Sequence, residues 1–258
     1  MTTRIFRPTS GKYMAVQITV IGSSPAWPNP GGAHSGYLFE AAGGRLLVDC
    51  GPGVLGRLRT REEWPQIDSI VITHFHLDHW GDLVPWVWGA LYRRTNGDGP
   101  GKPELWVHPG GRSHLEGLGA RLGFPDMFER VFEIYEYSDN GPFAAAGFEV
   151  VPVRLPHYTL ETYGFRVSSQ GHTVAYSGDS APSERLVALA RDADLFICEA
   201  TLERGELDGE PRGHLSAEEA IAAFEEAGAE RLLLTHRPAE LPTPTGVELA
   251  YDGLTLSL

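Results

Sequence analysis

The sequence predicts a single α/β domain over residues 1–258, in which two β-sheets are covered by helices. Three observations lead to this prediction. Short apolar runs with strand spacing alternate with helical patterns along the chain. Gly and Pro, with 31 and 19 copies, divide these runs into short elements. No linker, internal repeat or low-complexity segment marks a boundary between two domains.

The composition is that of a globular protein with a substantial core, because 42% of the residues are hydrophobic and 21% are charged. The net charge of −13 disfavours a large nucleic-acid-binding surface, since an acidic surface repels phosphate. The cysteines, Cys50 and Cys198, lie in apolar segments and are predicted to be buried thiols. We find no signal peptide and no membrane-span pattern, so we expect a cytoplasmic protein without membrane contact.

The first half of the chain is rich in strand patterns. Gly43 and Gly44 predict a two-residue turn that folds residues 36–51 into a hairpin. The other elements predicted in this half are strands at 15–22, 67–73 and 103–108, and helices at 53–59, 83–94 and 112–123.

The second half continues the mixture of strands and helices. Ser183 is a suitable N-cap for a helix over 183–193, and the S-x-x-E pattern at Ser216 predicts a capping box for a helix over 216–229. Strands are predicted at 148–155, 162–169, 172–179, 194–200 and 231–236.

The segment "THFHLDHW" at residues 73–80 carries the strongest chemical signal. It follows the apolar run "IDSIVI" and contains His74, His76, Asp78 and His79. His74 and His76 are two positions apart, so at an extended strand end they project to the same side. Imidazole and carboxylate groups suit Zn²⁺, Mn²⁺ or Fe²⁺. This spacing predicts that one strand exit offers ligands to two neighbouring metal positions.

Three further donors also come at strand ends. His157 follows "EVVPVRLP", Asp179 follows "TVAYSG", and His236 ends "RLLLT". A single histidine after a strand is more often structural. Because strand ends bring loops together, we expect all three to join the first cluster.

This set of motifs resembles the metallo-β-lactamase superfamily of dinuclear hydrolases over about residues 16–236. The resemblance implies a four-layer αββα sandwich. It also implies that His74, His76 and His157 hold one metal ion, that Asp78, His79 and His236 hold a second, and that Asp179 bridges them. Two divalent ions are therefore expected, with Zn²⁺ favoured over Mn²⁺ or Fe²⁺.

Within the superfamily, "SGDS", "EAT", "GHLS" and "LLLTH" follow one another as in the ribonuclease Z and cyclic-nucleotide phosphodiesterase branch. That resemblance implies that His214 assists proton transfer, and Glu199 is the candidate for its carboxylate partner. A purely structural carboxylate at Glu199 is an equal alternative. Aspartate rather than cysteine at residue 179 argues against a true β-lactamase of the commonest zinc type.

One departure from ribonuclease Z concerns substrate size. Its short bacterial form carries a tRNA-binding arm between the ligands that match His157 and Asp179, but only 21 residues separate them here. We therefore expect a phosphodiesterase that acts on cyclic nucleotides or similar small phosphodiesters, and no nucleic-acid polymer as a partner. The metal ions would activate a hydroxide, Asp78 would orient it, and His214 would protonate the leaving 3′-oxygen. The alternatives are a tRNA 3′-end endonuclease and a hydrolase of lactones, sulfate esters or phosphotriesters.

Several other residues have two interpretations. The aromatic side chains of segment 80–92, Trp80, Trp86, Trp88 and Tyr92, could stack a nucleobase, pack in a core or cover a homodimer interface. Of these, Trp80 is expected to form a wall of the site. His34 is a candidate for a position near the metal ions, whereas His108, His114 and His172 are expected to be structural or solvated. The acidic stretch 202–210 is expected to be a solvated loop or a lid.

Overall fold

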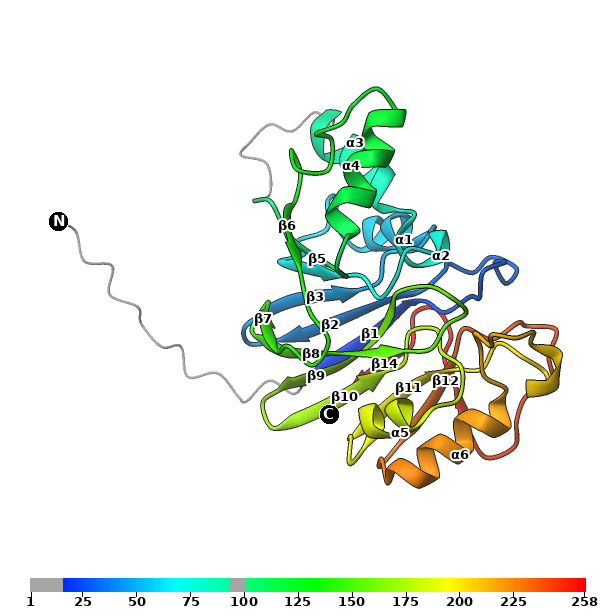
Figure 1. Cartoon of the computed structure of the whole chain (residues 1–258). Helices are drawn as coiled ribbons and strands as arrows, with labels where there is room; N and C mark the ends of the chain where they lie inside the picture. The colour runs from blue at the N-terminus through cyan, green and yellow to red at the C-terminus, as the bar shows by residue number, and fades with distance from the viewer. Residues whose placement is uncertain (1–15, 93–100) are drawn as a thin grey trace.

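The computed structural model describes residues 16–92 and 101–258. Within these residues, two seven-stranded sheets lie face to face, and helices cover the outer face of each sheet (Figure 1). This is the four-layer αββα sandwich that the resemblance implied. Apolar side chains of both sheets meet in the middle layer.

The first sheet is antiparallel from β14 to β3 and parallel from β3 to β6. Its strands, in spatial order, are β14 (Thr255–Ser257), β1 (Gln17–Gly22), β2 (Gly36–Ala41), β3 (Gly44–Val48), β4 (Ser69–Val71), β5 (Glu104–Val107) and β6 (Glu133–Glu136). Because the parallel strands all run the same way, their C-terminal ends lie at one edge of the sandwich.

The second sheet has the same division. It is parallel from β13 to β10 and antiparallel from β10 to β7. Its strands, in spatial order, are β13 (Glu248–Leu249), β12 (Leu232–Thr235), β11 (Leu195–Glu199), β10 (His172–Tyr176), β9 (Thr162–Ser169), β8 (Phe148–Leu155) and β7 (Phe143–Ala145). The turn between β9 and β10 is formed by Gln170 and Gly171, both with positive φ.

The helices divide between the two outer faces (Figure 1). Those over the first sheet are α1 (Val54–Arg61), α3 (Leu83–Tyr92) and α4 (Gly111–Arg121), and those over the second are α5 (Glu184–Ala190) and α6 (Ala217–Ala227). The two predicted N-terminal caps are confirmed: Ser183 accepts the Leu186 N–H, and Ser216 forms a capping box with Glu219. None of the helices in the described part of the chain is long and apolar enough to cross a membrane.

Three apolar layers account for the packing. Phe39 and Phe148 meet edge to face between the two sheets. Trp80 and Trp86 are buried between the first sheet and its helices, so the expectation that Trp80 forms a wall of the site is wrong. The indole N–H of Trp80 donates a hydrogen bond to the Phe75 carbonyl. Cys50 and Cys198 are buried free thiols, as predicted.

Four short strands and one short α-helix were not predicted. They are β6, β7, β13, β14 and α2 (Leu77–Trp80), which span two to four residues each. Such pieces are too short to show a hydrophobic period. The hairpin turn lies at Ala42 and Gly43 rather than at Gly43 and Gly44, since Gly44 already pairs with Ala41. Residues 93 and 94 of the predicted helix 83–94 lie outside the described residues.

The contact between Phe39 and Phe148 provides a test of the sheet packing. Phe39→Ala and Phe148→Ala should each lower the free energy of unfolding by about 3–5 kcal/mol, because each leaves a cavity between the sheets. The double variant should show a coupling of about 0.5–1.5 kcal/mol, since the two rings touch. Urea unfolding of the four proteins measures this. Leu122→Ala, at a half-exposed side chain, is the control and should cost at most about 1 kcal/mol. Strict additivity would contradict the packing described here.

Candidate functional site

The candidate site lies where strand ends of both sheets meet. His74 and His76 occupy the loop after β4, and Asp78 and His79 lie in the short helix α2 that follows. The second sheet contributes the other three predicted ligands, each just after a strand: His157 after β8, Asp179 after β10 and His236 after β12. The structure thus brings together all seven residues that the sequence singled out, from four separate segments.

The seven side chains form two groups that share Asp179. One group is His74, His76, His157 and Asp179, and the other is Asp78, His79, Asp179 and His236. In the second group, Asp78 Oδ2 lies 3.1 Å from His236 Nε2 and 3.5 Å from His79 Nε2. Asp179 Oδ1 lies 3.3 Å from His79 Nε2 and 3.6 Å from His236 Nε2. Ligand atoms on one tetrahedral zinc ion are about 3.3 Å apart, so these separations suit a metal ion.

The first group surrounds the other oxygen of Asp179 at slightly longer distances. Asp179 Oδ2 lies 3.8 Å from His74 Nε2 and 3.9 Å from His157 Nε2. His157 Nε2 also lies 3.0 Å from His76 Nδ1. His157 donates its Nδ1–H to the Gly213 carbonyl at 2.6 Å, so its Nε2 carries a lone pair. Two ring nitrogens directed at each other in this way suit a shared cation.

Unsatisfied polar atoms show that the residues fit metal ions. His74 Nε2, His79 Nε2 and Asp179 Oδ1 are buried and have no hydrogen-bond partner among the described residues. Buried polar atoms in proteins are almost always paired, and two divalent ions, one in each group, could serve as the missing partners of all three atoms. The outward nitrogens are occupied: His79 donates its Nδ1–H to Asp49 at 2.8 Å, and His236 Nδ1 lies 2.8 Å from the Thr201 hydroxyl. The free nitrogens therefore face inward, as ligands do.

The pKa shifts of four ligands favour metal binding. Burial lowers the pKa of His74 well below its usual value, and the neighbouring His79 lowers it further, so His74 is neutral. Burial also lowers the pKa values of His76 and His157. Burial opposes the charge of Asp179, but His236 and His79 outweigh it and hold the pKa of that carboxyl well below the usual range. Neutral imidazole and ionised carboxylate are the forms that bind metal ions. His79 differs: burial lowers its pKa, but the carboxylates of Asp179, Asp49 and Asp78 outweigh burial and raise it.

His214 and Glu199 form a pair beside these groups. His214 Nδ1 lies 2.9 Å from Glu199 Oε1 and 4.0 Å from Asp179 Oδ2. Burial lowers the pKa of His214, but the charges of Glu199, Asp179 and Asp208 together with the hydrogen bond to Glu199 outweigh it and raise the pKa to about 9. Glu199 is fully buried at the end of β11 and also accepts the Ser180 N–H and the Thr201 hydroxyl. It is therefore both a structural acceptor and the partner of His214.

Sequence reasoning missed the residues that orient the ligands. Asp49 is buried with a φ of 60° and accepts hydrogen bonds from His79 Nδ1, Thr73 and the Tyr176 hydroxyl. Thr201 lies against His236. Asp49 did carry a signal, because it is an acidic residue directly after the apolar strand "RLLV". Thr201 carried none beyond its place in "EAT".

The remaining histidines lie outside the two groups. His34 is nearly buried and donates Nδ1–H to the Pro25 carbonyl. His34 lies close to Asp78, because both residues border Gly51. A Cβ added at Gly51 would contact the Asp78 carbonyl oxygen and His34 Cβ. His108 and His114 pack on Phe75, and His172 lies 3.3 Å from Asp194.

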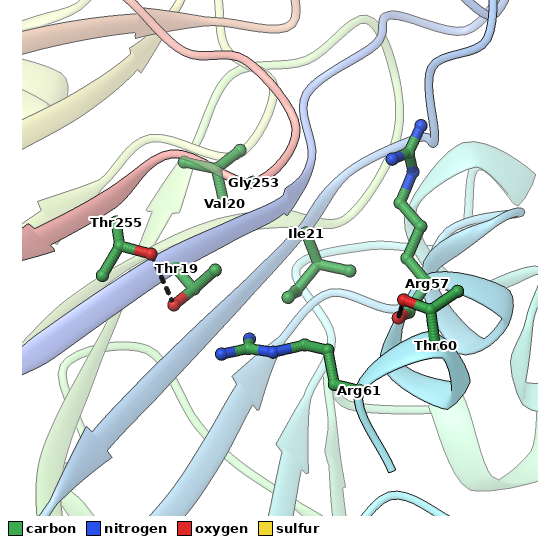
Figure 2. Close-up of a pocket in the computed structure, with 8 residues that line it drawn as sticks. All are labelled: Thr19, Val20, Ile21, Arg57, Thr60, Arg61, Gly253 and Thr255. Carbon is green, nitrogen blue, oxygen red and sulfur yellow. Dashed lines mark hydrogen bonds between the residues drawn. The ribbon is translucent and has the colours of Figure 1, made fainter. Parts of the chain in front are cut away.

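A pocket of about 330 Å³ lies away from these residues, between β1, α1 and the segment that begins β14 (Figure 2). Its charged lining residues are Arg57 and Arg61. No predicted site residue lines this pocket.

The role of Asp49 can be tested by metal affinity. Asp49→Ala should weaken zinc binding by about 10- to 100-fold, because His79 loses the acceptor that fixes its tautomer and orientation. Competition with a chromophoric chelator measures the affinity. Asp68→Ala is the matched control, since Asp68 accepts the Arg45 N–H on the surface and touches no predicted ligand. Equal affinities in the two variants would contradict this role for Asp49.

Comparisons with known proteins agree with this geometry. A family model described as the Beta-lactamase superfamily domain matches residues 44–237, which is more than half of the chain. The probable metallo-hydrolase YhfI of Bacillus subtilis (strain 168) is 30% identical over 223 residues, covering 86% of this chain and 87% of that protein. Rv1339 of Mycobacterium tuberculosis (strain ATCC 25618 / H37Rv), an uncharacterized protein, is 34% identical over 234 residues, covering 88% of this chain and 83% of that protein.

A ribonuclease Z and two solved structures extend the comparison. The ribonuclease Z of Myxococcus xanthus (strain DK1622) is 28% identical over 308 residues, covering 94% of this chain and 98% of that protein. The metallo-beta-lactamase fold protein YhfI from Bacillus subtilis superposes with a TM-score of 0.80 and 26% identity, covering 94% and 99% of the two chains. Human tRNase Z, short form, superposes with a TM-score of 0.72 and 25% identity, covering 93% and 98%. The chain therefore belongs to the beta-lactamase superfamily and is a metal-dependent hydrolase.

Proposed function

We propose that this protein is a phosphodiesterase that hydrolyses cyclic nucleotides or similar small phosphodiesters with the help of two divalent metal ions, preferably Zn²⁺ and otherwise Mn²⁺ or Fe²⁺. The observation that carries the proposal is the His214–Glu199 pair, 4.0 Å from the carboxylate that both ligand groups share. Cleavage of a phosphodiester whose leaving group is an alkoxide requires activation of the attacking water and protonation of the leaving oxygen. A two-metal site with a proton donor beside it provides both.

The two ligand groups would hold the ions: His74, His76 and His157 one of them, Asp78, His79 and His236 the other, and Asp179 both. When bound, the ions would lower the pKa of a water molecule and neutralise charge on the phosphoryl oxygens. The chain supplies the rest of the chemistry. Asp78 would accept a hydrogen bond from the attacking water and so direct it toward phosphorus.

His214 would complete the reaction. A new P–O bond forms to the attacking oxygen, the bond from phosphorus to the 3′-oxygen breaks, and the departing oxygen takes a proton from His214 Nε2. The geometry suits this step because His214 is held through Nδ1 by Glu199, and within the described residues its Nε2 has no partner. Glu199 would keep the imidazolium in place and stabilise its charge.

The length of chain between two of the ligands supports a small substrate. The hairpin of β9 and β10 takes up most of the interval between His157 and Asp179. The residues that remain there are too few for a long arm. The charge of −13 also disfavours a polynucleotide. These two observations support a small substrate and argue against a nucleic-acid polymer.

A tRNA 3′-end endonuclease is the second candidate. The similarity to the ribonuclease Z of Myxococcus xanthus over 94% of this chain favours it. That alignment spans 308 positions and this chain has 258 residues, so the relative contains segments without a counterpart here. A hydrolase of lactones, sulfate esters or phosphotriesters remains the third candidate, because the same metal pair can serve each reaction.

A homodimer is a further part of the proposal. Of the aromatic residues in segment 80–92, Trp88 and Tyr92 are exposed, and their rings stack on the outer surface of α3. They are the residues of this segment that a second copy of the chain could cover. Light scattering on the purified protein would determine the oligomeric state.

Activity on a substrate panel tests the proposed function. The metal-reconstituted protein should hydrolyse 2′,3′-cyclic AMP or 3′,5′-cyclic AMP, as well as bis-p-nitrophenyl phosphate, and should leave a precursor tRNA intact. Asp179→Ala should abolish the activity and lower the metal content below two ions per chain, because both groups lose their shared ligand. Cleavage of the tRNA alone would favour the second candidate. Inactivity on all four compounds with two ions bound would favour the third.

The role of His214 can be separated from metal binding. His214→Ala should lower kcat on a cyclic nucleotide by about 10²- to 10⁴-fold, since the alkoxide then leaves without a proton. The rate on bis-p-nitrophenyl phosphate should change little, because nitrophenolate is a stable leaving group. Steady-state kinetics on both substrates, with metal content measured alongside, tests this. An equal loss on both substrates would contradict a proton-donor role.

A further inference from the structure

The loop that carries His214 is tied to a single carboxylate. Asp208 Oδ2 accepts the backbone N–H of Gly213 at 2.7 Å and that of His214 at 2.9 Å. Its other oxygen, Oδ1, accepts the Tyr158 hydroxyl at 3.2 Å and the Gly209 N–H at 3.1 Å. Asp208 therefore links the backbone of the predicted proton donor to the loop that carries the ligand His157.

The contacts around Asp208 leave the His214 backbone little freedom. The Tyr158 N–H donates to the Arg212 carbonyl, and Arg212 donates to the His214 carbonyl at 3.1 Å. The Tyr158 ring fills the space beside Gly213, where a Cβ would come within 2.4 Å of ring atoms. The same ring packs on His157 and edge-on against His214. The amide of His214 is thus held by Asp208 and its carbonyl by Arg212.

The hydrogen bonds to Asp208 stabilise its ionised form. Partial burial opposes ionisation, but the N–H groups of Gly213 and His214 and the Tyr158 hydroxyl outweigh it and lower the pKa of the carboxyl. Charge-assisted hydrogen bonds of this kind are shorter and stronger than neutral ones. The adjacent acidic residues Glu206 and Glu210 are exposed, and neither has a hydrogen bond or ion pair among the contacts described for this loop. Asp208 is therefore distinct from the rest of the acidic stretch 202–210.

We propose that Asp208, assisted by Tyr158, is a positioning residue that holds His214 in line with the leaving oxygen. Asp208 acts through His214 and does not itself touch the substrate. The stretch 202–210, expected to be a solvated loop or a lid, contains in this view a support for the proton donor. This inference rests on the proposed function, because it assigns His214 the proton transfer described above. Displacement of a catalytic group by about 1 Å can cost about 100-fold in rate.

Leaving-group dependence tests the inference. Asp208→Ala should lower kcat on a cyclic nucleotide by about 10- to 100-fold and leave the rate on bis-p-nitrophenyl phosphate within about twofold. Tyr158→Phe, which removes one of the four hydrogen bonds, should have a smaller effect in the same direction. Glu206→Gln is the matched control from the same loop and should behave as the wild type. Metal content and thermal unfolding of each variant verify that the site is assembled.

Combination with His214→Ala shows whether Asp208 acts through that residue. The Asp208→Ala/His214→Ala double variant should be no slower than His214→Ala alone, since a positioning residue has nothing left to position. A further tenfold loss in the double variant, or an equal loss on both substrates in the single variant, would overturn the proposal.

A measurement independent of activity separates this inference from the proposed function. In ¹⁵N-histidine-labelled protein, the His214 Nδ1 proton that is hydrogen-bonded to Glu199 should give a resonance that His214→Gln removes. Asp208→Ala should broaden or abolish that resonance, and Glu206→Gln should preserve it. If the wild type hydrolyses no phosphodiester but the resonance responds as expected, the proposed function fails and the positioning role stands. An unchanged resonance in Asp208→Ala would overturn the positioning role whatever the substrate.

Discussion

The buried carboxylate of Asp179 is the constraint on which the rest of the site depends. An ionised group without solvent costs several kcal/mol unless opposite charges or hydrogen bonds surround it. Here its neighbours are histidines of both sheets, His74 and His79 from one and His157 and His236 from the other. Both sheets must therefore end at the same edge, and the packing of Phe39 against Phe148 maintains that arrangement.

A second set of contacts gives the ligands their direction. Asp49, the Gly213 carbonyl and Thr201 hold the outward nitrogens of His79, His157 and His236, which come from three different segments. Each imidazole thus has one nitrogen fixed by the protein and one directed inward. These partners are buried and belong to separate segments. The orientation of the ligands therefore does not depend on the conformation of any single loop.

The parts of the site that the sequence could predict are those encoded locally. His74, His76, Asp78 and His79 lie within six residues, and His157, Asp179 and His236 each follow a recognisable strand. Asp49 also follows an apolar strand, but its role depends on His79 and Thr73, which are distant in the chain, and the role of Asp208 depends on backbone groups that only the folded loop presents. The assignment of Trp80 to the site failed for a related reason: a neighbour in sequence can point to the opposite side of a short helix. The four-layer order followed from the resemblance, whereas strands of two or three residues, such as β13, left no periodic trace.

The turn at Gln170 and Gly171 has a practical consequence. It joins the C-terminal end of β9 to the N-terminal end of β10, and Asp179 follows the opposite end of β10. The turn is therefore separated from the catalytic edge by the full length of β10. A fluorophore, an affinity handle or a surface tether attached at this hairpin would leave the entrance for substrate open. The candidate site and the β9–β10 turn thus lie at opposite ends of the sandwich. An immobilised form of the enzyme should be anchored through the turn.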